Sequence, residues 1–405
     1  MQEPIIFRNQ SQEILQLYKD KNIIKILSGI RRAGKSFMLR LLRENLLKDG
    51  IKENQILYID FEDYENAVYL DSKKLYEFVK NQNEIVNGKR LYLLFDEIQE
   101  VQNWEKCVNS LYSSEKIDCD IYLTGSNANL LSSELATYLS GRYVNISVFP
   151  LSYKEFLEFY NETDSSESFF KYMKFGGFPG LKELSGSELS LKAYIDGIYS
   201  TVLLKDVISK NKIRDTAVLE KIILYIIDNI GNIFSAKRIS DFMKSSGRSL
   251  AVETVYNDLQ FLQSALFLYK VPRYDLKGKK ILETMEKYYI ADTGFRFQLL
   301  GFSDSAINGL LENLVYIELL RRGYKVYIGK SGDYEIDFVA EKNGTVEYYQ
   351  VCYLLSSEET RLRELRSLES LDDNYPKYIL TLDDLPQSNA NGIIRMNLRN
   401  WLLEK

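Results

Sequence analysis

The feature that most constrains this chain is a glycine-rich segment from Gly29 to Ser36, with the sequence G-I-R-R-A-G-K-S. It follows an apolar run over residues 23–27, so the pattern predicts a strand, a phosphate-binding loop and a helix in succession. The backbone N–H groups of such a loop form a concave anion site, and the positive end of the following helix faces the same charge. The alternative is a glycine turn before a surface helix, which would not require a lysine and a serine at these two positions.

The side chains of this loop have distinct expected roles. Lys35 is expected to neutralise phosphate oxygens, and the hydroxyl of Ser36 is expected to hold Mg²⁺. The residues expected to bind the nucleotide are Gly29, Arg31, Arg32, Ala33, Gly34, Lys35, Ser36 and Phe37. The segment therefore predicts an NTPase.

A second run, L-Y-L-L-F-D-E over residues 91–97, supplies the acids that such a site needs. Five consecutive apolar residues are typical of a strand buried on both faces of a parallel sheet, and Asp96 and Glu97 follow at the carboxyl end, where these sheets bind ligands. Asp96 is expected to orient Mg²⁺ through its water shell, and Glu97 to orient the water that attacks the γ-phosphate. An Asp-Glu pair after a strand also commonly caps a helix, but the upstream loop favours the catalytic interpretation.

The chain contains no histidine, which excludes Ser-His-Asp hydrolysis, Cys-His proteolysis and histidine-ligated metal sites. Water activation is left to carboxylates, lysine, tyrosine or a hard metal such as Mg²⁺. The three cysteines, Cys107, Cys119 and Cys352, lack a C-x-x-C spacing and are expected to be free thiols. No apolar stretch approaches the roughly 20 residues of a membrane span, and Met1 to Pro4 do not look like a secretory signal. We therefore expect a cytoplasmic protein without a membrane partner.

Alternating strand and helix patterns define the organisation. Further strands are predicted over 55–61, 120–124 and 143–148, with helices over 37–48 and 74–81 between them, so residues 1–150 should form a doubly wound parallel sheet. We expect a helical lid over 151–210, a winged helix over 211–295 and a small nuclease-like α/β domain over 296–405. The expected fold class is α/β, a P-loop NTPase sheet followed by these three parts.

Three groups of polar residues could extend the site at the sheet edge. Glu62 and Asp63 end the second strand and either line the same crevice or cap a loop. Ser126 follows a strand expected beside that of Asp96, so it is a candidate sensor of the γ-phosphate, although its neighbours are also ordinary turn residues. Arg142 is a candidate arginine finger, acting in cis or on a neighbouring subunit, and is equally well explained as a surface arginine.

Residues 216–282 have the pattern of a winged helix. Helices are predicted over 216–229 and 252–262, with a second one between them that ends near Gly247, and a hairpin turns at residues 276–279. Residues 231–282 carry nine lysines and arginines against four aspartates and glutamates, although the whole chain has a net charge of −5. A basic module of this kind suits a phosphate backbone, whereas docking of a protein partner is the alternative.

The carboxy-terminal residues resemble a metal-dependent nuclease fold with a P-D…[D/E]-x-K core. Glu312, Asp337 and Gln350 match the first three positions, but Cys352 stands where the lysine that helps to activate the nucleophile is expected. This departure favours a structural or DNA-handling relic over an active Mg²⁺ nuclease.

The order of these parts resembles a family of predicted AAA+ superfamily ATPases of bacteria and archaea, in which an ATPase core is fused to a carboxy-terminal domain of unknown function with winged-helix and nuclease-like parts. The resemblance covers nearly the whole chain and is carried by the phosphate loop with Arg31 and Arg32, and by residues 94–99, 123–126, 139–142, 150–152 and 335–338. It implies ATP and Mg²⁺ as cofactors, ATP hydrolysis, a homo-oligomer in which a neighbour's arginine completes the site, and a link to DNA.

Three functional hypotheses follow. The first is an ATPase that couples ATP turnover to DNA handling through the winged helix. The second is a nucleotide-dependent switch or scaffold that recruits a protein partner without DNA. The third and weakest is a residual Mg²⁺-dependent nuclease at Glu312, Asp337 and Gln350.

Overall fold

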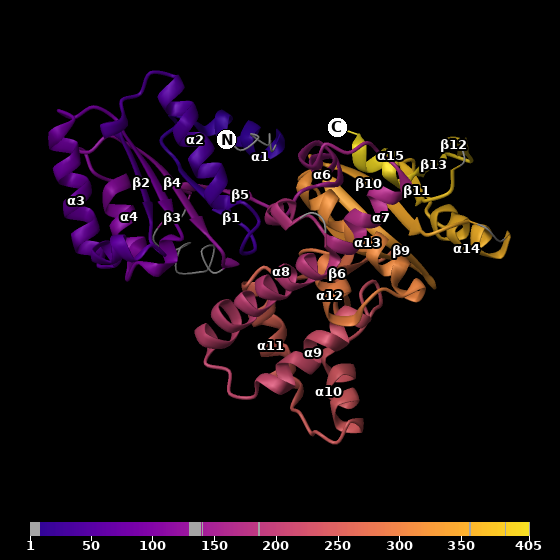
Figure 1. Ribbon diagram of the computed structural model, residues 1–405. Coiled ribbons are helices and arrows are strands. Elements are labelled where there is room, and N and C mark those ends of the chain that lie inside the picture. Colours follow the sequence, from indigo (N-terminus) through magenta and orange to yellow (C-terminus); the bar gives the residue numbers. More distant parts are fainter. Residues whose placement is uncertain are drawn as a thin grey trace. The chain divides into compact units, whose positions relative to one another are not determined.

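The computed structural model describes residues 9–128, 139, 141–184, 187–355, 358–384 and 386–404 (Figure 1). Met1 to Pro4 and Ser140, which entered the sequence analysis, lie outside these residues. The chain divides into two compact units, one built on the residues up to Val148 and the other on the residues from Phe149 onward. Within the described ranges, no helix has the length and apolar character needed to cross a membrane.

The first unit is built on a sheet of five parallel strands among its described residues, in the order β2-β3-β4-β1-β5. The strands are β1 (Ile24–Ser28), β2 (Ile56–Asp60), β3 (Leu91–Asp96), β4 (Cys119–Gly125) and β5 (Tyr143–Ser147). The helices are α1 (Asn9–Tyr18), α2 (Lys35–Lys48), α3 (Ser72–Ile85) and α4 (Trp104–Tyr112). Because all five strands run the same way, their carboxyl ends lie at one edge of the sheet, which confirms the predicted α/β class.

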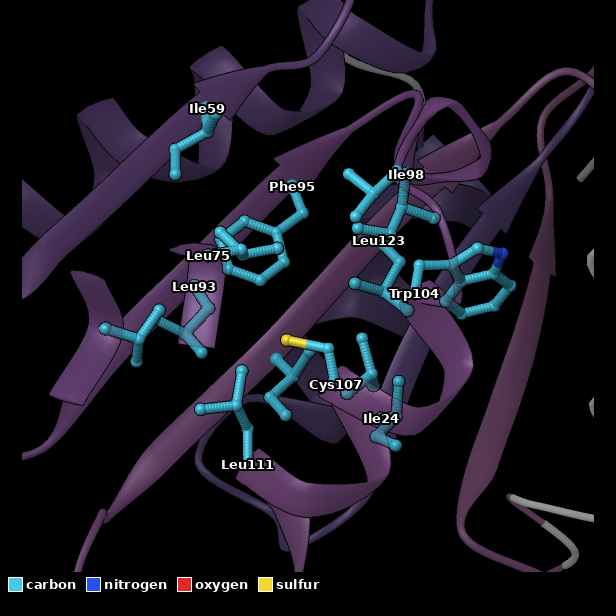
Figure 2. Close-up of a cluster of buried hydrophobic side chains, with 14 of the residues drawn as sticks. Ile24, Ile59, Leu75, Leu93, Phe95, Ile98, Trp104, Cys107, Leu111 and Leu123 are labelled. Atoms are coloured by element: carbon cyan, nitrogen blue, oxygen red, sulfur yellow. The ribbon is translucent and has the colours of Figure 1, made fainter. Parts of the chain in front are cut away.

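The core of this unit explains why the strands appear as apolar runs. Every residue of β1 and β3 is buried. Alternate residues of β3, among them Leu93 and Phe95, pack with Leu75 of α3 and with Trp104 and Leu111 of α4 on one face of the sheet (Figure 2). The intervening residues are buried as well, as expected for a parallel sheet covered on both faces.

The second unit begins with helices and continues into a mixed sheet. Its first helices are α6 (Tyr153–Tyr160), α7 (Ser166–Phe175), α8 (Glu188–Thr201), which continues as a π-helix over Val202–Ser209, and α9 (Thr216–Asp228). Next come α10 (Ala236–Ser245), α11 (Val252–Ser264) and the antiparallel strands β6 (Leu268–Asp275) and β7 (Lys280–Ile290). A short bridge between Phe234 and Glu286 joins the segment before α10 to β7.

The remaining elements complete the sheet of the second unit. They are α12 (Gly294–Leu300), α13 (Ile307–Arg321), β8 (Lys325–Ser331), β9 (Tyr334–Lys342), β10 (Thr345–Cys352), α14 (Glu358–Glu369), β11 (Lys377–Thr381), β12 (Ser388–Ala390), β13 (Ile393–Asn397) and α15 (Leu398–Leu403). In the described part of the chain, eight strands form one sheet in the order β12-β13-β11-β10-β9-β8-β6-β7.

The hairpin of β6 and β7 is hydrogen-bonded into the carboxy-terminal sheet. Arg273 to Asp275 of β6 pair in parallel with Ile328 to Lys330 of β8. This differs from the sequence-based expectation, which placed a domain boundary near residue 295, between the hairpin and the nuclease-like part. The physical reason is that one edge of β6 carries backbone N–H and C=O groups that β8 satisfies.

A buried carboxyl group, that of Asp292, joins the end of β7 to the loop after α7. It accepts hydrogen bonds from the N–H groups of Gly177 (2.7 Å) and Gly294 (2.9 Å). Gly176, between α7 and Gly177, has a φ of 78°, and a Cβ atom there would lie 1.6 Å from Oδ1 of Asp292. Burial raises the pKa of Asp292 to about 7, even though both N–H groups act to lower it.

This raised pKa gives a testable pH dependence. Between the usual carboxyl pKa near 4 and a pKa near 7, Asp292 of the folded chain holds a proton that the unfolded chain has lost. The stability of the second unit should therefore fall as the pH rises from about 4 to about 7, and it should level off above about pH 7. From pH 5.5 to pH 8 the contribution is up to about 2 kcal/mol. We expect Asp292→Asn to remove this part of the slope in thermal unfolding measured at both pH values.

Two other carboxyl groups of the second unit also have raised pKa values, so they contribute to the same fall of stability with pH. Burial raises the pKa of Asp258 to about 6 and that of Glu312 to about 8, so the variant should retain a smaller slope of the same sign. If Asp292→Asn keeps the full slope of the natural protein, Asp292 does not hold its proton in this range.

Candidate functional site

The glycine-rich segment forms a tight loop at the carboxyl edge of the first sheet, directly after β1. Arg32 and Gly34 both have left-handed backbones, with φ values of 66° and 102°, and the N–H group of Ala33 donates to the carbonyl of Ile30 at 3.1 Å. A loop with left-handed residues at such close spacing turns its N–H groups toward a common concave side. At Gly29, a Cβ atom would lie 2.1 Å from the carbonyl oxygen of Val148, so the start of the loop requires glycine.

Helix α2 begins directly after this loop with an end that suits an anion. Gly34 occupies the N-cap position and makes no side-chain capping bond, and the first turn carries no acidic residue. The first N–H groups of a helix have no partner inside the helix, and together with the helix dipole they favour a phosphate group. Ser36 and Phe37 are half-buried in this first turn, and Arg32 is exposed beside it.

Lys35 and Glu97 meet beneath the loop. The side chain of Lys35 is buried, and its Nζ donates to the carbonyls of Gly29 (3.0 Å) and Ile30 (3.4 Å) and lies 3.4 Å from Oε1 of Glu97. Lys35 follows β1 and Glu97 follows β3, and β4 separates these two strands in the sheet. The structure thus brings together the lysine and the acid that the sequence predicted from two separate motifs.

The acid pair is held by residues of both neighbouring strands. Asp96 is fully buried, and its carboxylate accepts hydrogen bonds from the hydroxyls of Tyr58 on β2 (3.0 Å) and Thr124 on β4. The hydroxyl of Thr124 in turn accepts a hydrogen bond from the N–H group of Glu97 at 2.9 Å. Glu97 has a left-handed backbone, with φ 54° and ψ 49°, which this hydrogen bond helps to hold in place.

The electrostatics of the site keep Glu97 ionised. Burial acts to raise its pKa, but the Lys35 ammonium and then the Gln99 amide outweigh burial and lower the pKa of Glu97 to about 2. The carboxylate is therefore anionic across the physiological range, and it can accept a hydrogen bond from water.

A second carboxyl group lies at the same edge of the sheet. Asp60 ends β2 directly beside Asp96 in the sheet register, and burial raises the pKa of Asp60. In the described part of the chain, no group of three or more acidic or cysteine side chains could hold a metal ion by itself. Mg²⁺ commonly uses one or two protein oxygens and takes the rest from phosphate groups and water. Asp96 and the hydroxyl of Ser36 are the groups that would hold it.

The other residues that were predicted at this edge lie in different surroundings. Nη1 of Arg31 lies 2.9 and 3.1 Å from the two carboxylate oxygens of Glu62, so Glu62 borders the loop. Asp63 instead accepts a hydrogen bond from the N–H group of Glu65 and caps a short 3₁₀ helix. Ser126 is fully buried just beyond β4, at the predicted edge, and its role as a sensor stays a prediction.

Arg142 does not reach this edge within its own subunit. It directly precedes β5, and β5 is parallel to β1 with Tyr143 opposite Ile24, so Arg142 lies at the amino-terminal edge of the sheet. Its guanidinium donates to Asn109 (2.6 Å) and Ser113 (3.2 Å) of the segment around α4. A five-residue strand spans roughly 15 Å, so Arg142 lies away from the loop in this structure, and a finger acting in cis stays a prediction that this position does not support. Action on a neighbouring subunit stays a prediction.

A second polar cluster lies in the second unit, where the nuclease-like residues were predicted. Glu312 of α13, Asp337 of β9 and Gln350 of β10 converge. Oε1 of Gln350 accepts a hydrogen bond from the N–H group of Asp337 (3.2 Å), and Oδ2 of Asp337 accepts one from the N–H group of Val351 (2.9 Å).

The centre of this cluster is a lysine that the sequence analysis did not identify. Nζ of Lys287, on β7, lies 2.9 Å from Glu312, 2.9 Å from Glu335 and 3.2 Å from Asp337, and its side chain is 3% exposed. The hydroxyl of Tyr289 donates to Glu312 at 2.8 Å.

The ammonium group of Lys287 takes the place that a cation would have among these carboxylates. A divalent metal at the same oxygens would have to displace it. Burial also raises the pKa of the Cys352 thiol to about 12, so a neutral thiol stands at the position of the expected catalytic lysine.

Comparisons with known proteins agree with the two-part architecture. A family model described as an AAA domain matches residues 21–157, and one described as a domain of unknown function matches residues 166–306. An uncharacterized protein of Haemophilus influenzae is 38% identical over 400 residues and covers 98% of both chains. An uncharacterized protein of Methanocaldococcus jannaschii is 33% identical over 386 residues, which cover 90% of this chain and 83% of that protein.

A solved structure supports the same fold. The Walker-type ATPase of Pyrococcus abyssi superposes with a TM-score of 0.51 at 17% sequence identity, covering 74% of this chain and 97% of that one. At this level of identity the likeness concerns the fold alone.

Proposed function

This chain belongs to the AAA+ family of P-loop ATPases, and on that premise we propose that it hydrolyses ATP and couples the hydrolysis to the handling of duplex DNA. The observation that carries the ATPase half is the meeting of Lys35 and Glu97 beneath the glycine loop, at a distance of 3.4 Å and next to the buried Asp96.

Each residue of this site has a role that its surroundings support. The N–H groups of the loop and the ammonium of Lys35 bind and orient the phosphate groups, and Ser36 and Asp96 hold Mg²⁺. When bound, Mg²⁺ neutralises charge on the phosphate oxygens. Glu97, kept anionic by Lys35 and Gln99, accepts a hydrogen bond from the attacking water and orients it.

The DNA half of the proposal rests on the segment from α9 to β7. Helix, short bridge, two helices and hairpin is the order of elements in a winged helix. Basic side chains are exposed along it, in α10 (Lys237, Arg238 and Lys244), in the following turn (Arg248) and at the tip of the hairpin (Lys277, Lys279 and Lys280). The exposure of these cations on a chain of net negative charge supports contact with a phosphate backbone.

The hairpin lysines give the experiment that tests this half. Each phosphate contact releases counterions, so the affinity for duplex DNA should fall steeply with salt, and the variant Lys277→Ala/Lys279→Ala/Lys280→Ala should lower the slope of log affinity against log salt by about 1 to 3. Titration of a labelled duplex at several salt concentrations measures this slope.

A matched variant controls for net charge. Lys52→Ala/Lys89→Ala/Lys116→Ala removes three exposed lysines of the first unit and should leave the slope unchanged. If the natural protein binds no duplex at low salt, this result contradicts the DNA half of the proposal. It then favours the second candidate function, a switch that recruits a protein partner. The exposed aromatic side chains of Phe242 on α10 and Tyr256 on α11 are the observation in favour of that candidate.

A further inference from the structure

We infer that Gln99 is a positioning residue for ATP hydrolysis: it keeps hold of one carboxylate oxygen of Glu97 while bound phosphates draw Lys35 away from the other. The freed oxygen then faces the attacking water. This role rests on the proposed ATP hydrolysis and deepens it, because it makes the readiness of Glu97 depend on the presence of a triphosphate.

The two carboxylate oxygens of Glu97 have different partners. Nζ of Lys35 lies 3.4 Å from Oε1, whereas Nε2 of Gln99 donates a hydrogen bond to Oε2. An ionised carboxylate only accepts hydrogen bonds, so the amide of Gln99 must turn its nitrogen toward Glu97 and its oxygen away. Glu97 is therefore held from two sides by groups of different chemistry.

These two contacts respond differently to a triphosphate. The ammonium of Lys35 already donates to the carbonyls of Gly29 and Ile30 in the phosphate loop. Phosphate oxygens at this loop compete directly with the carboxylate for that ammonium, because both are anionic acceptors. The neutral amide of Gln99 attracts phosphate far less, so it stays on Oε2 while Lys35 turns from Oε1 to the phosphates.

The backbone that carries Gln99 is held firmly enough for this task. Gln99 is the middle residue of the 3₁₀ helix Ile98–Glu100, in which the N–H group of Glu100 donates to the carbonyl of Glu97 at 3.1 Å. The side chain of Ile98 is fully buried in the core of the first unit (Figure 2). A donor on such a support can fix a carboxylate before the reaction begins, without reorganisation during it.

The other end of the Gln99 amide shows that this side chain is not there for stability. Its Oε1 is buried, and among the described residues no group donates a hydrogen bond to it. A buried acceptor without a partner weakens a fold, and such atoms are uncommon outside sites with a function. An apolar side chain of similar size should therefore fold at least as well as Gln99.

The variant Gln99→Met tests this role, because methionine has a similar length and no donor. We expect kcat to fall roughly 10- to 100-fold, since the carboxylate is no longer held in one orientation. KM for ATP should change by less than about threefold, because Gln99 does not touch the phosphates. Phosphate release gives both constants, and the midpoint of thermal unfolding should stay the same or rise.

The pH profile separates positioning from a structural role. The charged groups around Glu97 are Lys35, Arg31 and the carboxyl groups of Asp60 and Asp96. The Gln99 amide helps to lower the pKa of Glu97, so in Gln99→Met the acid limb of kcat should move to higher pH. Titration of the other groups is common to all variants and does not produce this difference.

The variant Gln99→Glu provides a rescue. At pH 8 it places a second carboxylate beside Glu97 and should lower kcat at least as much as Gln99→Met does. At about pH 5.5 the two carboxyl groups can share a proton, and the protonated one donates as the amide does, so kcat relative to the natural protein should recover about fivefold or more.

Gln102→Met is the matched control, since Gln102 is exposed on the same segment, and it should leave kcat unchanged. A natural kcat in Gln99→Met would overturn the inference. So would a loss of kcat that comes with a lower unfolding midpoint and no recovery of Gln99→Glu at acid pH, since Gln99 would then be structural. Absence of ATP turnover in the natural protein would instead overturn the proposed function, and the role of Gln99 with it.

Discussion

Replacing Glu97 with glutamine is expected to lower ATP turnover by roughly 10²- to 10⁴-fold while ATP still binds. The glutamine has the same shape and leaves the buried hydrogen bond from the Glu97 backbone to Thr124 in place, but it removes the anion that orients the water. It also removes the carboxylate 3.4 Å from Lys35, which leaves that ammonium free for phosphate. Phosphate release measures turnover, and calorimetry with a non-hydrolysable ATP analogue measures binding.

Two further variants sharpen this expectation. Lys35→Ala should abolish both ATP binding and ATP turnover. The ammonium of Lys35 is buried against the loop carbonyls, and the variant loses this cation that we propose to bind the phosphate groups. Glu62→Gln removes a nearby acid that pairs with Arg31 at the border of the loop, and turnover should stay within about tenfold. Turnover of Glu97→Gln close to that of the natural protein would show that another group, such as Asp60, orients the water.

The pH profile gives an independent check on the same residue. A catalytic acceptor with a pKa of about 2 stays ionised from pH 5 to pH 8, so Glu97 should produce no loss of activity on the acid side of this range. A loss of turnover toward acid pH that disappears in a variant of Asp60 would assign it to that carboxyl group, whose pKa is raised by burial.

The phosphate loop and the acid pair could be predicted because their residues are close in sequence and their strands are buried on both faces. Residues 91–96 appear as a continuous apolar run since neither face of β3 meets water, and this places Asp96 and Glu97 at the carboxyl edge. The partners of Asp96 could not be predicted in the same way. Tyr58 reaches Asp96 only because β2 pairs with β3 in a register that sets Tyr58 opposite Leu94.

Arg142 illustrates a physical rule that the sequence analysis did not apply. In a parallel sheet the residue before a strand lies at the edge opposite to the residues after the strands. Since residues 143–148 were predicted as a strand of that sheet, the same pattern already placed Arg142 far from a loop that follows β1. A role on a neighbouring subunit is compatible with this position.

Lys287 was missed for a different reason. It lies in the strand β7, and its partners come from α13 and β9, which are 25 to 50 residues away along the chain. The neighbouring residues in the sequence do not distinguish a buried lysine in such a strand from a lysine exposed to solvent. The hairpin was also expected to belong to another domain, whereas its pairing with β8 brings it into the sheet that contains Asp337.

Lys287→Met is expected to destabilise the second unit by about 3 to 5 kcal/mol, the usual cost of leaving buried charges without their partner. Three carboxylates surround this single ammonium, and burial already raises the pKa of Glu312 to about 8. Without the ammonium, Glu312 would keep its proton to a still higher pH in the folded chain, because Lys287 acts to lower the pKa of this group. The part of the destabilisation that depends on Glu312 should therefore grow as the pH rises above about 8, where the natural folded chain ionises this group and the variant does not.

Urea unfolding followed by the fluorescence of Trp401, in a Trp104→Phe background, reports on the second unit because the chain has two tryptophans and Trp401 is buried there. Lys174→Met removes a half-buried lysine that pairs with Glu188 at 2.8 Å near the surface, and it should cost less than about 1 kcal/mol. Adding Glu312→Gln to Lys287→Met should restore part of the loss, since the chain then no longer has to take up a proton at this position on folding. A cost for Lys287→Met no larger than that of Lys174→Met would show that the ammonium does not neutralise the cluster.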